Sequence, residues 1–65
     1  MSGIIQGAVL FIDKSSLPTL ARRMEREMPG ESFVVSMSCK EGKVVVRLFD
    51  HFGDKAEFRR VVQSL

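Results

Sequence analysis

The chain has 65 residues, which is room for one domain and close to the lower limit at which a hydrophobic core stabilises a fold without metals or disulfides. Hydrophobic residues make up 45% of the chain and charged residues 28%, a composition typical of a folded protein and not of a disordered one. The net charge of +2 is too small to indicate a nucleic-acid-binding protein by itself. We therefore expect residues 1–65 to form a single domain, which self-association would help to stabilise.

Cysteine usage and hydropathy bear on the compartment. The single Cys39 cannot form an internal disulfide, so the fold does not depend on an oxidising environment. The longest apolar stretch, Ala8 to Ile12, is far shorter than a membrane span or the core of a signal peptide, and the N-terminus lacks a basic region. These features favour a cytoplasmic protein without a membrane partner.

Residues 4–13 are rich in Ile, Val, Leu and Phe and end in a polar turn, which predicts a β-strand. The strand is apolar on both faces, because Val9 and Phe11 lie on one side and Leu10 and Ile12 on the other. Such a pattern calls for cover on both faces, and the sequence does not decide which side meets the core.

A helix follows, with Ser16 as its expected N-cap and Pro18 close to its first position. Its end is predicted at Pro29 and Gly30. Apolar residues at helical spacing form one stripe: Leu17, Leu20, Ala21, Met24 and Met28.

Residues 32–40 and 43–50 both alternate between apolar and other side chains, as the two arms of a β-hairpin do. With Glu41 and Gly42 as a two-residue loop, the expected pairs are Cys39 with Val44, Met37 with Val46, and Val35 with Leu48. All six of these residues then share one face, together with Phe33. The reverse face pairs Val34 with Phe49, Ser36 with Arg47, and Ser38 with Val45.

Asp54, with Glu57 three residues later, predicts the start of a second helix. Its apolar stripe consists of Phe58, Val61, Val62 and Leu65. Together the elements predict an α+β fold of order β-α-β-β-α, a two-layer sandwich with a three-stranded mixed sheet and both helices on one face. The sequence does not fix the order of the strands, although we favour the third strand at the centre.

The residue types give little indication of a catalytic site or a metal site. Cys39 and His51 are the only cysteine and histidine, and the predicted hairpin separates them by roughly 23 Å, at ~3.3 Å per residue. Asp50 and His51 are adjacent in the chain, so they point to opposite faces of a strand. There is no paired metal-ligand spacing and no glycine loop for phosphate. We expect a non-enzymatic protein without cofactor, metal or small-molecule substrate.

The outer surface of the helix layer is the first candidate binding face. Five of the arginines project from the solvent sides of the two helices: Arg22, Arg23, Arg26, Arg59 and Arg60. They could bind nucleic acid or an acidic protein surface. Glu25, Glu27 and Glu57 lie on the same helices, so an ordinary solvated surface is the other interpretation.

The sheet face that the helices leave open is the second candidate. It presents Val34, Val45, Arg47 and Phe49, joined by whichever side of the first strand is left over. Exposed apolar patches of this kind mark interfaces, so we expect a homodimer or another protein partner there. Base stacking has little support, because Phe49 is the only aromatic residue on this part of the face.

The chain resembles the DinI-like proteins, small bacterial and phage-borne modulators of the RecA filament in the DNA-damage response. The similar features are the element order, Ser16-Leu17-Pro18 at the first helix, Val44-Val45-Val46 in the third strand, and Asp54-Lys55 before a helix with Val61 and Leu65. The resemblance implies the same fold and a small regulator. The chain differs from the family in its last helix, which is acidic in DinI-like proteins and carries Arg59 and Arg60 here.

The sequence thus favours a small cytoplasmic regulatory or inhibitory protein that binds a protein partner and forms a homodimer, and the resemblance implies that it is phage-related. The alternative is a nucleic-acid-binding module that uses the arginines of the helix layer.

Overall fold

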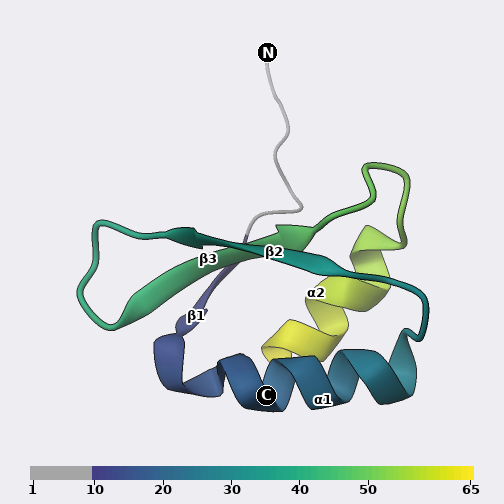
Figure 1. Ribbon diagram of the computed structural model, residues 1–65, viewed down its shortest axis with the longest axis horizontal. Helices are drawn as coiled ribbons and strands as arrows, with labels where there is room; N and C mark the ends of the chain where they lie inside the picture. The colour runs from purple at the N-terminus through teal and green to yellow at the C-terminus, as the bar shows by residue number, and fades with distance from the viewer. Residues whose placement is uncertain (1–9) are drawn as a thin grey trace.

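The computed structural model describes residues 10–65, and within this range the elements follow the predicted β-α-β-β-α order (Figure 1). Strand β1 (Leu10–Asp13) leads through a 3-10 turn (Lys14–Ser16) into helix α1 (Leu17–Glu27). Strands β2 (Phe33–Met37) and β3 (Lys43–Leu48) form the hairpin, and helix α2 (Lys55–Gln63) follows. The α+β fold class is confirmed, whereas the part of the predicted first strand before Leu10 lies outside the described residues.

The strand order is β1-β3-β2, which confirms the prediction that the third strand is central. Both pairings of β3, with β1 and with β2, are antiparallel. The expected mixed sheet is therefore wrong. β1 and β2 run in the same direction, but β3 lies between them, so no parallel ladder forms among the described strands.

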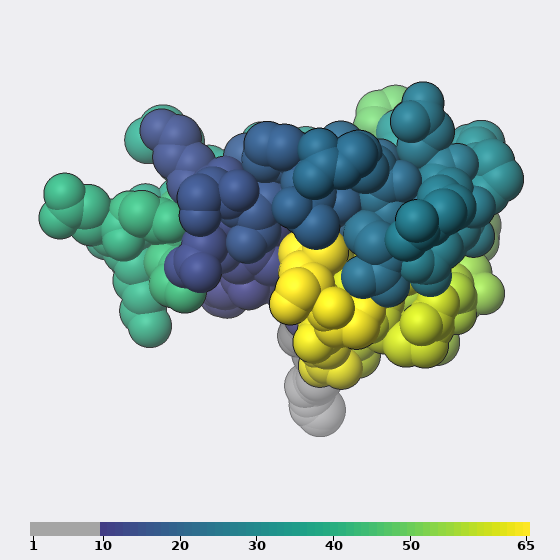
Figure 2. Space-filling view, turned by 90° about the horizontal axis from the view of Figure 1, so that it is seen from below, coloured from purple at the N-terminus to yellow at the C-terminus, as the bar shows by residue number. Residues whose placement is uncertain are grey.

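Both helices cover one face of the sheet, as predicted (Figure 1). Seen from the helix side, α1 and the C-terminal end of α2 lie next to each other (Figure 2). The core between the two layers is apolar and takes residues from every main element except β2: Ile12, Leu20, Met24, Met28, Val44, Val46, Leu48, Phe58, Val61 and Val62. The β2 residue Phe33 is partly buried against this core.

The hairpin register differs from the expected one by two residues. The pairs are Phe33 with Leu48, Val35 with Val46, and Met37 with Val44. A longer loop causes the shift, because β2 ends at Met37 and β3 begins only at Lys43. The predicted faces are kept, since side chains alternate with a period of two and a two-residue shift leaves their sides unchanged.

The longer loop changes the surroundings of two residues that we expected in the core. Cys39 lies in the loop and is exposed, so its predicted pairing with Val44 on the face shared with Phe33 is wrong. Met37 occupies the predicted face, yet 93% of it is exposed. Figure 2 shows that the teal and green end of the hairpin projects beyond the helix layer, which explains this exposure.

The two helix starts behave differently. Asp54 caps α2 as predicted, because its Oδ1 accepts a hydrogen bond from the Glu57 backbone N–H at 3.0 Å. Ser16 stands at the N-cap position of α1, but its side chain makes no capping hydrogen bond. The 3-10 turn leads directly into α1 with Ser16 in a helical conformation, so the expected side-chain cap is absent.

Candidate functional site

The sheet surface away from the helices carries a group of apolar side chains around one arginine. We call it the open sheet face and define it by five residues: Phe11, Val34, Val45, Arg47 and Phe49. The ladder pairs Phe11 with Val45 and Val34 with Arg47, which places these four residues on one side. Phe49 follows β3 directly, and its N–H donates to the Ser32 carbonyl oxygen at 2.8 Å, so it continues the same alternation.

Exposure of large aromatic rings distinguishes this face. Phe11 is 59% exposed and Phe49 is 70% exposed, whereas the core residue Phe58 is fully buried. Val34 and Val45 are half-buried between them. Apolar side chains that remain in water are the usual sign of a surface that another molecule covers.

Arg47 supplies the charge at the middle of the open sheet face. Its Nη1 donates only a long hydrogen bond, 3.4 Å, to the Leu48 carbonyl oxygen, and it has no acidic partner within residues 10–65. Asp13 and Lys43, which pair in the ladder, form an ion pair of 2.6 Å at one end of the face. The guanidinium is thus available to a carboxylate of a partner.

Phe11 was not among the residues that we assigned to this face from the sequence. The first strand is apolar on both sides, so its pattern alone cannot tell which side meets the core. The register resolves the choice: Ile12 pairs with buried Val44 and is itself buried, which turns Phe11 outward.

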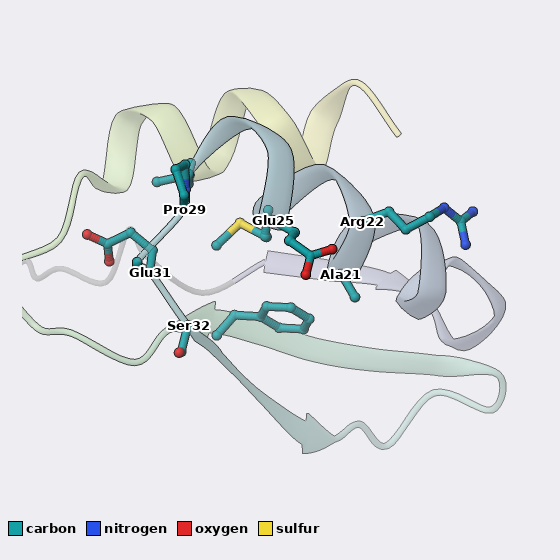
Figure 3. A pocket seen from close by; sticks show the side chains of 10 residues that line it. Ala21, Arg22, Glu25, Pro29, Glu31 and Ser32 are labelled. Atoms are coloured by element: carbon teal, nitrogen blue, oxygen red, sulfur yellow. The ribbon is translucent and has the colours of Figure 1, made fainter.

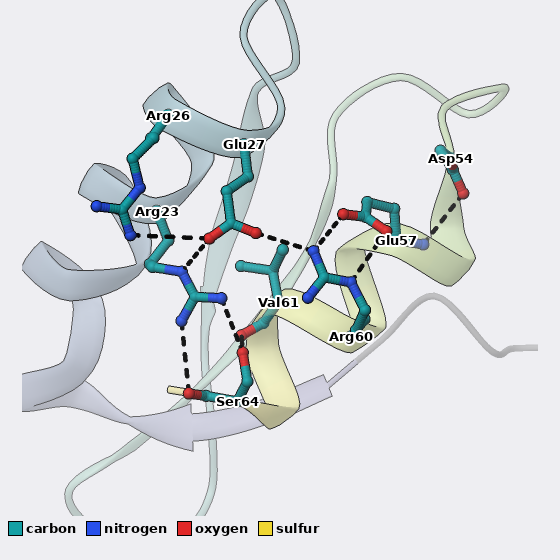
Figure 4. Close-up of polar contacts among 8 residues, drawn as sticks. All are labelled: Arg23, Arg26, Glu27, Asp54, Glu57, Arg60, Val61 and Ser64. Atoms are coloured by element: carbon teal, nitrogen blue, oxygen red, sulfur yellow. Dashed lines mark hydrogen bonds and ion pairs between the residues drawn. The ribbon is translucent and has the colours of Figure 1, made fainter.

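The arginines of the helix layer do not form one open basic patch. Arg23 donates to Glu27 at 2.5 Å, and Arg60 donates to the other oxygen of Glu27 at 2.8 Å and also to Glu57 (Figure 4). Arg23 further donates to the Ser64 hydroxyl at 2.9 Å. These side chains join α1 to α2, so the prediction that Arg23 points away into solvent is wrong.

Proton affinities in this cluster follow from the hydrogen bonds. Those from Arg23 and then Arg60 stabilise the ionised carboxylate and lower the pKa of Glu27 to about 2. The hydrogen bond from Arg60 likewise lowers the pKa of Glu57, and the two carboxylates together raise the pKa of Arg60. The cluster therefore stays fully charged across the neutral range and acts as a clamp between the helices.

The other three arginines, Arg22, Arg26 and Arg59, are exposed on the helix surface. Arg26 lies 3.8 Å from Glu27, a distance at which the pair is weak and its side chain remains 75% exposed. The helix layer thus offers fewer available cations than the sequence indicates. Nucleic-acid binding through these arginines stays a prediction.

Cys39 and His51 lie beyond opposite ends of β3, in separate loops. Both are exposed, and His51 packs edge-on against Phe52 with ring centroids 5.2 Å apart. Within the described residues, no three His, Cys, Asp or Glu side chains lie where they could bind one metal ion. In the same part of the chain, no helix has the length and hydrophobicity needed to cross a bilayer.

Comparison of the chain with protein-family models, with curated proteins and with solved structures finds no match. The resemblance to the DinI-like proteins therefore stays a prediction that rests on element order and a few residues.

Proposed function

We propose that the chain is a non-enzymatic regulatory protein that binds a protein partner through the open sheet face. The observation that carries the proposal is the exposure of Phe11 and Phe49 on the sheet face that the helices do not cover. A regular sheet provides a rigid platform for these rings, so little order is lost when a partner covers them.

The chemistry of the face favours a protein over a nucleic acid. Two aromatic rings, two valines and one arginine resemble the composition of protein interfaces, where aromatic residues and arginine dominate the binding energy. Phe11 pairs with Val45, and Phe49, which follows β3 directly, lies four residues beyond Val45, roughly 13 Å away at ~3.3 Å per residue. That spacing is too wide for two bases that follow each other in a strand, which stack closely on neighbouring aromatic side chains.

The expected partner presents an apolar patch with a carboxylate near its centre. The patch would cover the two phenylalanines, and the carboxylate would accept two hydrogen bonds from Arg47. The proposal includes a regulatory role for the chain and a location in the cytoplasm.

The test compares proteins captured from a lysate by the tagged chain and by three single variants. Phe11→Ser and Phe49→Ser remove a ring from the open sheet face, whereas Phe52→Ser removes a ring that is 90% exposed in the loop after β3. We expect the amount of one captured partner to fall at least tenfold with each of the two face variants and to stay unchanged with Phe52→Ser. A tenfold loss of affinity corresponds to about 1.4 kcal/mol of binding free energy. Capture that all three variants leave unchanged contradicts the proposal.

A salt series separates the nucleic-acid alternative from this proposal. Binding through Arg22, Arg26 and Arg59 would weaken steeply as salt rises, and its slope would fall when one of them is replaced by Ala. If DNA and RNA do not shift the chain in a gel at low salt, the alternative is wrong.

A further inference from the structure

The free edge of the sheet at β2 is a second surface that the fold leaves incomplete. We propose that this edge accepts an extended segment of a partner protein as a fourth strand, whose inward side chains enter the groove between β2 and α1. The inference uses different residues from the open sheet face and does not depend on it.

The backbone of β2 is ready for another strand. Phe49 N–H donates to the Ser32 carbonyl, so the hydrogen-bonded pairs with β3 are those of Ser32, Val34 and Ser36. The N–H and C=O groups of Phe33, Val35 and Met37 alternate with them and therefore point away from β3, toward the free edge. A strand laid along this edge would satisfy all of these groups.

Side chains on the same three residues point into the space that a fourth strand would cover. Phe33, Val35 and Met37 share the core side of the sheet with Val44, Val46 and Leu48. Yet Val35 is 43% exposed and Met37 is 93% exposed, whereas their partners on β3 are buried. The apolar layer that covers β3 thus stops before it reaches the edge of β2.

A groove of about 550 Å³ lies where inward side chains of the added strand would go. It runs between α1, which contributes Ala21, and the start of β2, next to Ser32 (Figure 3). Met24, Met28 and Phe33 also line it. Ala21 and Glu25 of α1 look onto this groove and not onto the core. The groove has room for two or three apolar side chains from alternate positions of a strand.

Typical helix and strand dimensions leave room for one more strand beside three strands and two helices. Two packed helices span about 20 Å at an interaxial distance of about 10 Å. Three strands span about 14 Å at about 4.8 Å each, and a fourth brings the sheet to about 19 Å. One additional strand beside β2 would therefore let the sheet match the helix layer that already lies beneath it.

Charge determines which kind of segment fits. Residues 32–39 contain no charged side chain, no proline and no glycine, although exposed edge strands usually carry such residues to prevent pairing. A charge placed over Val35 and Met37 would lose its water without gaining a partner, whereas Arg22, Glu25 and Glu31 line the groove beside Phe33. The matching segment is consequently uncharged at its centre, with apolar side chains at alternate positions. A second copy of the chain fits less well, because it would bring its own α1 into the space beside α1.

Amide hydrogen exchange tests the proposal at single residues. The probe is a capped seven-residue peptide, Thr-Val-Thr-Val-Thr-Val-Thr, added to the full chain, with a peptide carrying Pro at the central position as control. In the free chain, Val34 and Ser36 amides should exchange slowly and Val35 and Met37 amides rapidly. With nine-tenths of the chain bound, we expect the Val35 and Met37 amides to slow by about tenfold, because exchange proceeds from the unbound fraction. The Pro-containing peptide should have little effect.

Matched variants on one strand provide the second readout. Met37→Lys places a charge on the helix side of the β2 edge, whereas Ser36→Lys places the same charge on the opposite side of β2. Both residues are exposed, so neither change disturbs the core. Peptide protection should weaken at least tenfold with Met37→Lys and persist with Ser36→Lys. The proposal is overturned if the peptide leaves Val35 and Met37 unprotected, or if their protection rises with chain concentration alone, which would identify a second copy as the occupant.

Discussion

Phe58 and Phe49 are two phenylalanines of one chain in opposite surroundings, and replacing each by Ala tests which face of the sheet is the core. Phe58 is fully buried, so Phe58→Ala should lower the free energy of unfolding by about 3–5 kcal/mol through lost burial and a residual cavity. Phe49 is 70% exposed. Only roughly a third of its side chain leaves water on folding, so Phe49→Ala should lower the same quantity by about 0.5–1 kcal/mol.

These magnitudes matter because the chain is small. A domain of 65 residues has a free energy of unfolding of about 3–10 kcal/mol, so Phe58→Ala brings it close to unfolding at room temperature. The chain has no Trp and no Tyr, and urea unfolding is therefore best followed by far-UV circular dichroism. Equal destabilisation by the two variants would refute the assignment of Phe49 to an uncovered face.

Three further changes test the helix clamp, the loop before α2 and the α2 cap. The wild-type chain should be more stable than the Glu27→Gln variant at neutral pH. This difference should disappear as pH falls from about 4.5 to about 2, because the folded state favours the ionised form of Glu27. Urea unfolding at several pH values measures the difference, and a difference that persists at pH 2 contradicts the clamp. Gly53→Ala should destabilise the chain by about 1–3 kcal/mol, because its new Cβ would lie 3.2 Å from the Asp50 carbonyl oxygen and closer still to two side chains; an unchanged melting temperature would contradict this crowding. Asp54→Ala should lower the free energy of unfolding by about 0.5–2 kcal/mol, because the Glu57 N–H loses its cap. Asp54→Asn should retain most of this stability, since its side-chain oxygen can accept the same hydrogen bond. Equal losses in the two variants would show that charge and not the hydrogen bond matters.

Hairpin parity explains why much of the fold could be predicted from the sequence. Alternation over residues 33–48 determines which side chains share a face, and that information survives an error of two residues in the register. The loop length was the part that alternation could not determine. The Ser38 hydroxyl accepts a hydrogen bond from the Lys40 N–H at 3.0 Å, a local contact that removes Ser38 and Cys39 from the ladder.

The candidate site was only partly predictable. Val34, Val45, Arg47 and Phe49 were assigned correctly to the open sheet face by alternation, but Phe11 required the register of β1 against β3. The helix arginines were misjudged for a different reason. Whether Arg23 reaches the carboxylate of Glu27 and the end of α2 depends on the packing of two helices, which a single helical wheel does not contain.

Neighbouring valines on β3 provide the most direct test of the proposed interface. Val45 belongs to the open sheet face and Val46 is fully buried under the helices, so their methyl groups differ mainly in the side of the sheet on which they lie. In a cross-saturation experiment with the captured partner, we expect the Val45 methyl signals to lose intensity strongly and the Val46 signals to lose little. Intensity losses confined to the side chains of Arg22, Arg26 and Arg59 would place the partner on the helix layer and contradict the account.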